Sequence, residues 1–181
     1  MISVLIPTFN SERLLVPALS ALVAGSAEGL LREVILADGG STDGTEKIAD
    51  AAGCEFRRGP PDADERLKAA AAGARGDWLL FLEPSSVLEE GWTREVAKFV
   101  EGAERAGQAE ICAAVFRLTI DDYGFSPRVK ELAAAARLAL TGRPRPEQGL
   151  LISKQLFASR GRSARRVVML RTRVVVPATI C

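Results

Sequence analysis

Three short polar stretches hold the residues of this chain that are best suited to chemistry, and each follows an apolar run. They read P-T-F-N at residues 7–10, D-G-G-S-T-D-G-T at residues 38–45 and E-P-S-S at residues 83–86. Carboxylates can hold hard divalent cations, and backbone amides in tight turns can hold phosphates. The three stretches therefore predict a phosphate or metal site, if the fold brings them together.

The composition excludes several classes of catalytic site. The chain contains no histidine, so Ser-His-Asp, Cys-His and HExxH chemistry are all excluded. Its three cysteines, Cys54, Cys112 and Cys181, are far apart and odd in number, which fits neither a disulfide framework nor a CxxC metal site. We expect them to be buried or incidental thiols.

Length and charge indicate one soluble domain that spans residues 1–181. Hydrophobic residues make up 48% of the chain and charged residues 26%, as in ordinary globular proteins. The net charge of +1 does not favour a nucleic-acid partner. No apolar run is long enough for a transmembrane segment, and no signal peptide precedes the first strand-like residues. A cytoplasmic protein is therefore expected.

Strand-like and helix-like segments alternate over the first hundred residues, judged from apolar runs, helical spacing and turn residues. Strands are predicted at 2–6, 33–37, 54–57 and 78–82, and helices at 14–23, 46–52, 65–75 and 90–105. Further strands are predicted at 111–120 and 148–152, and one or two strands broken near Arg171 at 167–176, with a helix at 127–140.

This alternation predicts an α/β fold in which helices flank a mostly parallel sheet. Ligands of such sheets bind beyond the C-terminal ends of the strands. The three polar stretches fall at predicted strand ends, so we expect them to face one crevice.

Three sequence blocks resemble a known family. They are I-P-T-F-N-S-E at 6–12, E-V-I-L-A-D-G-G-S-T-D-G-T at 33–45 and A-R-G-D-W-L-L-F-L at 74–82. In this order they resemble family 2 glycosyltransferases, which have the Rossmann-like, nucleotide-sugar-binding glycosyltransferase A (GT-A) fold. The resemblance implies a nucleotide-binding half at 1–100, a shortened acceptor half at 101–181, and a UDP- or GDP-sugar as partner.

The resemblance places the nucleotide against the first two stretches. Asp38 and Asp43 can accept hydrogen bonds from a base or ribose, and Phe9 is expected to flank the base. The full set expected at the nucleotide is Pro7, Thr8, Phe9, Asn10, Glu12, Asp38, Gly39, Asp43 and Arg66. The alternative is that Asp38 ends a strand while Ser41 or Asp43 caps the next helix.

Two departures from the family bear on the diphosphate. The loop before the third helix reads D-A-D-E-R-L-K at 62–68, where the subgroup has G-R-A-x-Q-M-N. Arg66 and Lys68 are able to reach a diphosphate from there, or else form a solvated helix face. The family's metal-binding aspartate is also missing, since the chain reads E-P-S after its fourth strand. Because Mg²⁺ can be held by one or two carboxylates and the phosphates, Glu83 is the candidate ligand for Mg²⁺ or Mn²⁺. A residual turn without metal is the alternative.

The later chain lacks the family's catalytic base. Residues 158–173 contain no acid where members carry an E-D-like segment, so the catalytic residues are left unassigned. Glu147, Asp121 and Asp122 are the later acids that could substitute. The arginines of this segment suggest nucleic acid or anionic lipid, but no aromatic residues are interleaved for base stacking, so a solvated edge is favoured.

The sequence thus supports two functions. The first is a family 2-like glycosyltransferase that moves a sugar from a nucleotide-sugar to an unknown acceptor, with activity that is weak or lost. The second is a non-catalytic nucleotide-binding or protein-interaction descendant of the same fold. The donor sugar, the acceptor and the oligomeric state cannot be read from the residues.

Overall fold

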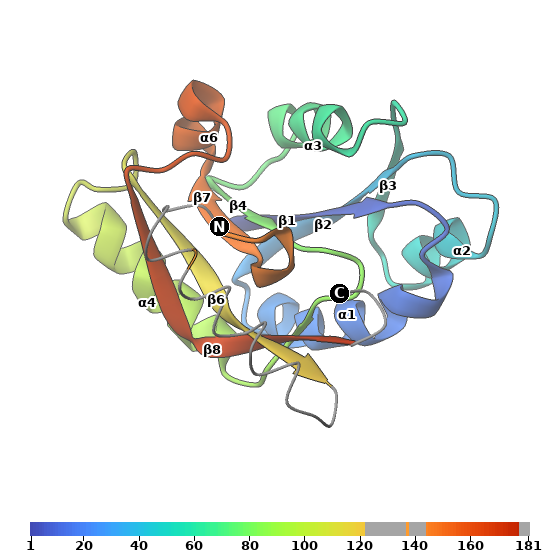
Figure 1. Ribbon diagram of the computed structural model, residues 1–181, viewed down its shortest axis with the longest axis horizontal. Coiled ribbons are helices and arrows are strands. Elements are labelled where there is room, and N and C mark those ends of the chain that lie inside the picture. Colours follow the sequence, from blue (N-terminus) through green and yellow to red (C-terminus); the bar gives the residue numbers. More distant parts are fainter. Residues whose placement is uncertain (122–136, 138–143, 178–181) are drawn as a thin grey trace.

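One mixed sheet runs through the protein in the computed structural model, which describes residues 1–121, 137 and 144–177 (Figure 1). Its strands are β1 Ile2–Thr8, β2 Leu31–Asp38, β3 Glu55–Arg58, β4 Trp78–Phe81, β5 Val87–Leu88, β6 Cys112–Asp121, β7 Leu150–Ser153 and β8 Arg166–Pro177. Its helices are α1 Glu12–Ala27, α2 Thr45–Ala51, α3 Ala63–Ala72, α4 Trp92–Arg105, the 3-10 turn η1 Pro146–Gln148 and α6 Lys154–Arg160.

The strand order is β3-β2-β1-β4-β7-β6-β8-β5. The first four strands of this order are parallel, as are β6 and β8. In contrast, β7 runs antiparallel to both of its neighbours, and β5 runs antiparallel to β8. The predicted α/β fold is confirmed, and its second half is more mixed than a parallel sheet.

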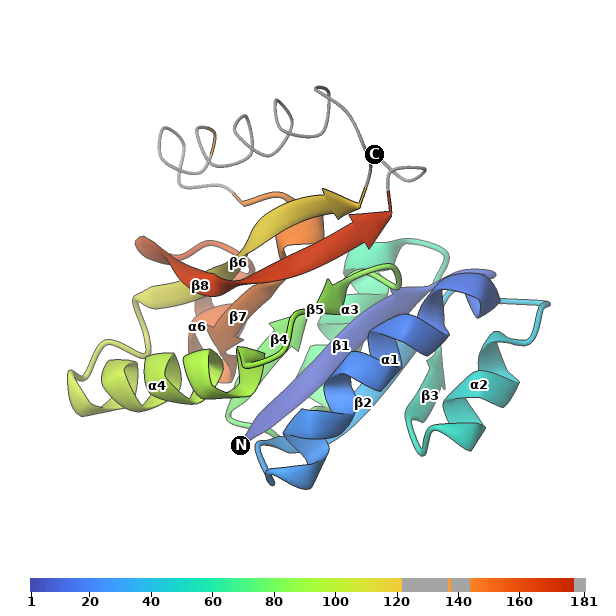
Figure 2. The same cartoon turned by 90° about the horizontal axis from the view of Figure 1, so that it is seen from below.

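Helices cover both faces of the sheet because the central strands are apolar on both sides. In β1, Val4 and Ile6 pack with α1 and α4, while Leu5 packs with α3 and α6 on the other face. Figures 1 and 2 show this arrangement, with α3 and α6 above the sheet and α1, α2 and α4 below it. The sequence of β1 thus dictates a layer on each side.

The predicted elements within the described residues are present, with ends shifted by a few residues. The segment predicted as one or two strands broken near Arg171 is a single strand, β8. Its register against β6 does shift there: Met169 pairs with Val115 and Arg173 with Arg117, so β8 carries extra residues at that point. The helix predicted at 127–140 lies outside the described residues apart from the helical Arg137.

Three elements were not predicted, namely β5, the 3-10 turn η1 and α6. Helix α6 begins after Ser153, whose hydroxyl accepts a hydrogen bond from the Leu156 amide at 3.1 Å. This is an N-cap, and it was readable from the sequence as a serine before a helix-forming run. Cys54 and Cys112 are free thiols. Within the described ranges, no helix has the length and apolarity needed to cross a membrane.

Candidate functional site

The three polar stretches meet at one edge of the sheet. Thr8 pairs with Asp38 across β1 and β2, and Leu5 pairs with Phe81 across β1 and β4. The C-terminal ends of these parallel strands therefore lie side by side. Because β7 is antiparallel to β4, with Leu150 opposite Phe81, the segment that precedes β7 reaches the same edge. Sequence patterns gave no sign of this last contribution, since it depends on a pairing between distant strands.

Hydrogen bonds join the first stretch to the second. The Asn10 amide donates to Ser41 Oγ at 2.8 Å, and the Thr42 amide donates to Asn10 Oδ1 at 2.9 Å. Asn10 has a positive φ of 48°, a conformation that asparagine tolerates better than most residues. Glu12 adds a second link, because its carboxylate accepts the Gly44 amide at 2.8 Å. Asn10 and Glu12 therefore fix the shape of this edge.

Asp38 lies at the centre of the joined stretches and is fully buried. Its Oδ1 accepts from Thr8 Oγ1 at 3.0 Å and from the Ser41 hydroxyl. Its Oδ2 accepts the amides of Gly40 and Ser41, both at 2.8 Å. Burial alone would raise the pKa of Asp38, but the hydrogen bonds from Ser41, Gly40 and Thr8 outweigh it and lower the pKa. Asp38 and Thr8 therefore hold the loop at residues 38–45 in place from its buried side.

Asp43 links the first turns of α1 and α2. Its carboxylate accepts the Thr45 amide at the start of α2 and the Glu12 amide, both at 3.0 Å. The Thr45 hydroxyl also donates to it and is the main cause of its lowered pKa. The N-cap of α2 is Gly44, with no side-chain capping bond, so Asp43 is not the helix cap but braces the start of α2 from one position earlier and ties it to α1.

Arg66 is buried, in contrast to one of the two interpretations of the sequence. Only 6% of the residue is exposed, so it does not form a solvated helix face. Its guanidinium donates to the carbonyl of Ala37 at 3.1 Å and to those of Pro60 and Pro61. A Cβ at Gly39 would lie 2.7 Å from Arg66 Nη1. Gly39 therefore makes room for a buried arginine.

Phe9 and Pro7 remain accessible at this edge. Phe9 is 62% exposed, which is unusual for an aromatic side chain with no partner element. Pro7 is half-buried and lines a crevice of about 420 Å³ that opens beside it. Phe9 follows Pro7 by two residues and does not itself line the crevice, but its exposed ring is accessible for stacking against a base.

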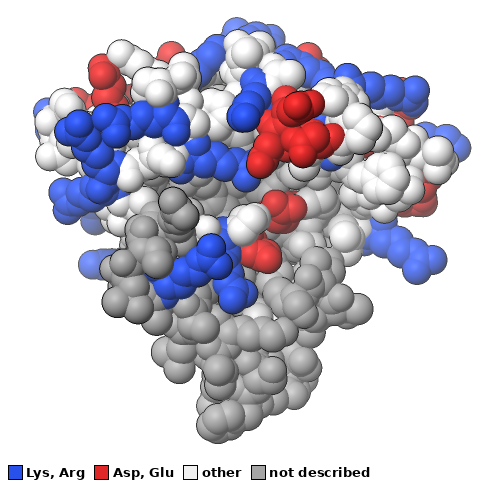
Figure 3. All heavy atoms as spheres, turned by 45° about the horizontal axis from the view of Figure 1, so that its top comes forward, with Lys and Arg blue, Asp and Glu red and all other residues white. Residues whose placement is uncertain are grey.

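The crevice is rich in arginine. Glu83 from the end of β4 lines it together with Arg137, Arg145 and Arg162 from the later chain. The Arg162 guanidinium lies 5.2 Å above the centroid of the Phe81 ring. In Figure 3, where the side with α3 and α6 is turned forward, basic side chains gather beside a central hollow, with acidic side chains close to them. The sequence predicted Glu83 at this site but did not predict these three arginines.

Glu83 is half-buried. Burial raises its pKa above the usual value; Arg162 opposes this effect, and the nearby carboxylates of Glu147 and Asp64 add to it. The Glu147 Oε2 atom is buried and has no hydrogen-bond partner in the described part of the chain. The later acid Glu147, noted from the sequence, is thus close enough to Glu83 to influence its charge.

The crevice suits a divalent cation poorly. No group of three or more metal-binding side chains occurs in the described ranges. Glu83 shares the crevice with three guanidinium groups, whose positive charges would repel a second cation. Ser85, where the family's aspartate was expected, is only 4% exposed. The residues present therefore do not fit the metal that the family resemblance implies.

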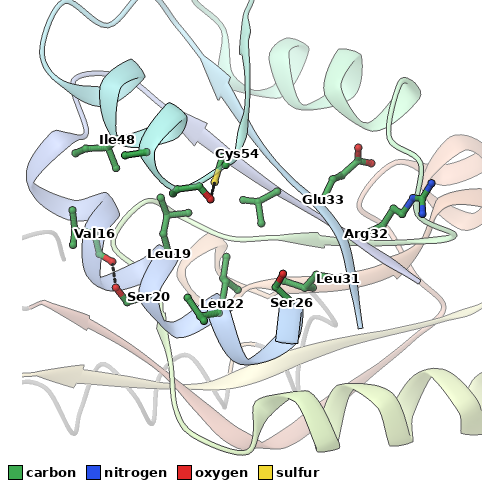
Figure 4. Close-up of a pocket in the computed structure, with 15 residues that line it drawn as sticks. Val16, Leu19, Ser20, Leu22, Ser26, Leu31, Arg32, Glu33, Ile48 and Cys54 are labelled. Carbon is green, nitrogen blue, oxygen red and sulfur yellow. Dashed lines mark hydrogen bonds between the residues drawn. The ribbon is translucent and has the colours of Figure 1, made fainter. Parts of the chain in front are cut away.

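A second hollow, of about 530 Å³, lies away from this edge between α1, α2 and the start of β2. Figure 4 shows its walls, with Val16, Leu19 and Leu22 from α1 and Ile48 from α2. Its lining is mainly apolar, so it lacks the convergent charges that would hold a nucleotide.

Comparison with known proteins agrees with this arrangement. The sequence matches the glycosyl transferase family 2 profile over residues 3–145. The chain therefore belongs to glycosyl transferase family 2, and its fold is the GT-A fold. No curated protein matches it.

Two groups of solved structures share the fold. A crystal structure of Staphylococcus aureus TarS, residues 1–349, has a TM-score of 0.65 and 16% identity, and the match covers 87% of this chain and 48% of that one. The TarS complex with UDP has a TM-score of 0.70 and 16% identity, with 97% and 60% coverage. Mycobacterium tuberculosis glucosyl-3-phosphoglycerate synthase with Mn²⁺, UDP and glucosyl-3-phosphoglycerate has a TM-score of 0.60 and 21% identity, with 98% and 70% coverage. The chain thus spans about half the length of the first TarS structure.

Proposed function

We propose that this chain binds a nucleotide-sugar, with UDP or GDP as the nucleotide, and transfers the sugar to an acceptor. The observation that carries the proposal is the crevice lined by Pro7 and Glu83 at the strand ends of a family 2 domain, with the exposed Phe9 two residues after Pro7 in the chain. Phe9 and Pro7 flank the base, and the loop organised by Asp38 offers its outer backbone to the ribose. The diphosphate then extends along the edge into the crevice.

The neighbouring structures support this choice of ligand. TarS and glucosyl-3-phosphoglycerate synthase were both crystallised with UDP. Transfer requires the acceptor hydroxyl to lose a proton as it attacks the sugar. Among the described residues that line the crevice, Glu83 is the carboxylate available for this step, and its raised pKa brings it closer to the neutral range in which a general base works best.

Calorimetry with UDP, GDP and uridine tests the binding half of the proposal. We expect one of the two diphosphates to bind more tightly than uridine. Release of free nucleotide from UDP-glucose or GDP-mannose, followed over hours, tests the transfer half. Failure of both diphosphates to bind, with or without Mn²⁺, would refute the function.

A second function is favoured by the basic segment at 158–173, which contains no carboxylate. In that case the domain binds the nucleotide-sugar without transferring the sugar. Tight binding of UDP or GDP with no release of nucleotide from any sugar donor would identify this non-catalytic role.

A further inference from the structure

We propose that the guanidinium groups of Arg145 and Arg162 bind the diphosphate of the nucleotide and take the place of a divalent metal ion. This inference rests on the nucleotide site proposed above, and it goes further by naming the groups that neutralise the phosphates. It is drawn from the crevice at the ends of β1 and β4, whose described lining contains three arginines and one carboxylate, Glu83.

The path of the ligand leads to these arginines. A base against Phe9 and a ribose over the Asp38 loop place the sugar-phosphate chain at the end of β1. The next strand in that direction is β4, and the crevice lined by Pro7 and Glu83 opens at its end. The diphosphate therefore enters the space that Arg145 and Arg162 border.

The position of the Arg162 side chain suits the binding of an anion. It lies over the Phe81 ring, and its Nη1 is 3.5 Å from Asp64 Oδ1. This long, partly exposed ion pair occupies only one side of the guanidinium, whose side chain remains 37% exposed. An arginine stacked on an aromatic ring loses less freedom when it binds a phosphate, and it can bind in a bidentate manner.

Arg145 approaches from the segment that precedes η1. Its backbone amide donates to Gln148 Oε1 at 3.0 Å, which fixes the start of the turn. Its guanidinium has no carboxylate or hydrogen-bond acceptor among the described residues. A cation that lines a crevice without a counterion is a suitable partner for a phosphate.

The charges balance better with a diphosphate than with a metal. A nucleoside diphosphate carries about three negative charges near neutral pH. The crevice supplies the guanidinium groups of Arg145 and Arg162. The carboxylates beside them are Glu83, which lines the crevice, and Asp64, which forms the long ion pair with Arg162. A divalent cation added to this set would bring further positive charge and would need oxygen ligands that Glu83 alone does not provide.

The experiment measures UDP and inorganic pyrophosphate binding by calorimetry, in EDTA and in Mn²⁺. The variants are Arg145→Gln and Arg162→Gln, with Arg165→Gln as the matched control, because Arg165 is exposed and does not line the crevice. We expect UDP to bind in EDTA, with less than a twofold change on adding Mn²⁺. Arg145→Gln and Arg162→Gln should each weaken UDP and pyrophosphate at least tenfold, and Arg165→Gln less than twofold.

Two controls separate folding from binding. Circular dichroism of each variant checks the fold, and Arg145→Gln is the cleaner change because it breaks neither the Asp64 ion pair nor the contact with Phe81. Uridine should bind the arginine variants as it binds the unaltered protein, since it lacks the phosphates.

The outcomes distinguish this inference from the proposed function. If UDP binds only with Mn²⁺, or binds the arginine variants unchanged, the inference is wrong and the nucleotide site stands. If UDP does not bind under any condition, the proposed function fails, and pyrophosphate binding alone then tests the anion site. Pyrophosphate binding that Arg145→Gln removes would then still support an anion site, and its absence would overturn both proposals.

Discussion

At the scale of single residues, the polar stretches of this protein serve its own loops before they serve a ligand. Asp38 was expected at the nucleotide, yet it is buried and accepts four hydrogen bonds from Thr8, Gly40 and Ser41. The sequence located the right edge of the sheet. It could not show which way the carboxylate points. That depends on how the backbone turns back at Gly40 and Ser41, and on Thr8, which lies thirty residues away in the chain.

Replacement of Asp38 by alanine therefore tests stability and binding together. Its loss leaves buried donors without an acceptor, so we expect Asp38→Ala to destabilise the fold by about 3 kcal/mol. The loop would loosen, and UDP affinity should fall by about 1–3 kcal/mol. Urea unfolding and calorimetry measure the two effects. Asp50→Ala, an exposed carboxylate on α2, is the control, and an equal effect of both variants would contradict the role of Asp38.

The pH dependence of this contribution has a definite sign. The pKa of Asp38 is lowered in the folded state, so its stabilisation is present above the unfolded-state pKa and is lost as pH falls through the folded-state pKa. The difference in stability between the unaltered protein and Asp38→Asn should therefore shrink in acid. Unfolding curves at pH 7 and at successively lower pH values check this.

The contribution of Glu83 to stability depends on pH with the opposite sign to that of Asp38. Burial raises its folded-state pKa, so the ionised form disfavours the folded state above that pKa, and the penalty vanishes below the unfolded-state pKa. We expect Glu83→Gln to stabilise the protein at pH 7 and to have little effect in acid, as measured by thermal unfolding. The exposed Glu90, changed in the same way, is the control. A loss of stability at pH 7 would show that the charged form of Glu83 is bound by a favourable partner.

At the scale of elements, hydrophobic patterning was enough to find the strands and helices of the first half, because each strand is a short apolar run and each helix has an apolar face. It could not give the neighbours of β7. That strand lies between β4 and β6, antiparallel to both, and this pairing joins residues that are about seventy positions apart in the chain. For the same reason Arg162, which reaches the crevice, was interpreted with the other arginines of 158–173 as part of a solvated edge.

The close approach of β1 to the turn before β4 can be tested with two glycines. A Cβ at Gly76 would lie 2.5 Å from the Ser3 backbone nitrogen, and backbone atoms cannot move aside. We expect Gly76→Ala to destabilise the protein by about 2 kcal/mol. Gly102 in α4 has no atom within 4 Å of the same position, so Gly102→Ala should stabilise by about 0.5–1 kcal/mol. Chemical denaturation of both variants compares them, and similar losses at the two sites would argue against a steric cause.

At the scale of the whole molecule, the two halves expected from the sequence share one core. The cluster below the sheet includes Leu80 from the first half together with Phe116 and Val174 from the second. The cluster above it includes Leu79 and Ile152. The family match ends at residue 145, whereas the sheet continues through β7 and β8. We propose that residues 1–181 form one cooperative unit.

Removal of the chain beyond the family match tests this unit. A protein of residues 1–145 lacks β7, so β4 and β6 lose the strand that lies between them, and it also lacks β8, which pairs with β6 and β5. The exposed strand edges and apolar faces would favour aggregation over folding. We expect 1–145 to show no cooperative unfolding transition, and 1–181 to show a single one whether followed by tryptophan fluorescence or by circular dichroism. Fluorescence is informative because Trp78 and Trp92 are both buried in the shared core. A folded 1–145 that still binds UDP would mean that the nucleotide-binding half is independent, and that the arginines after β7 are dispensable for the site.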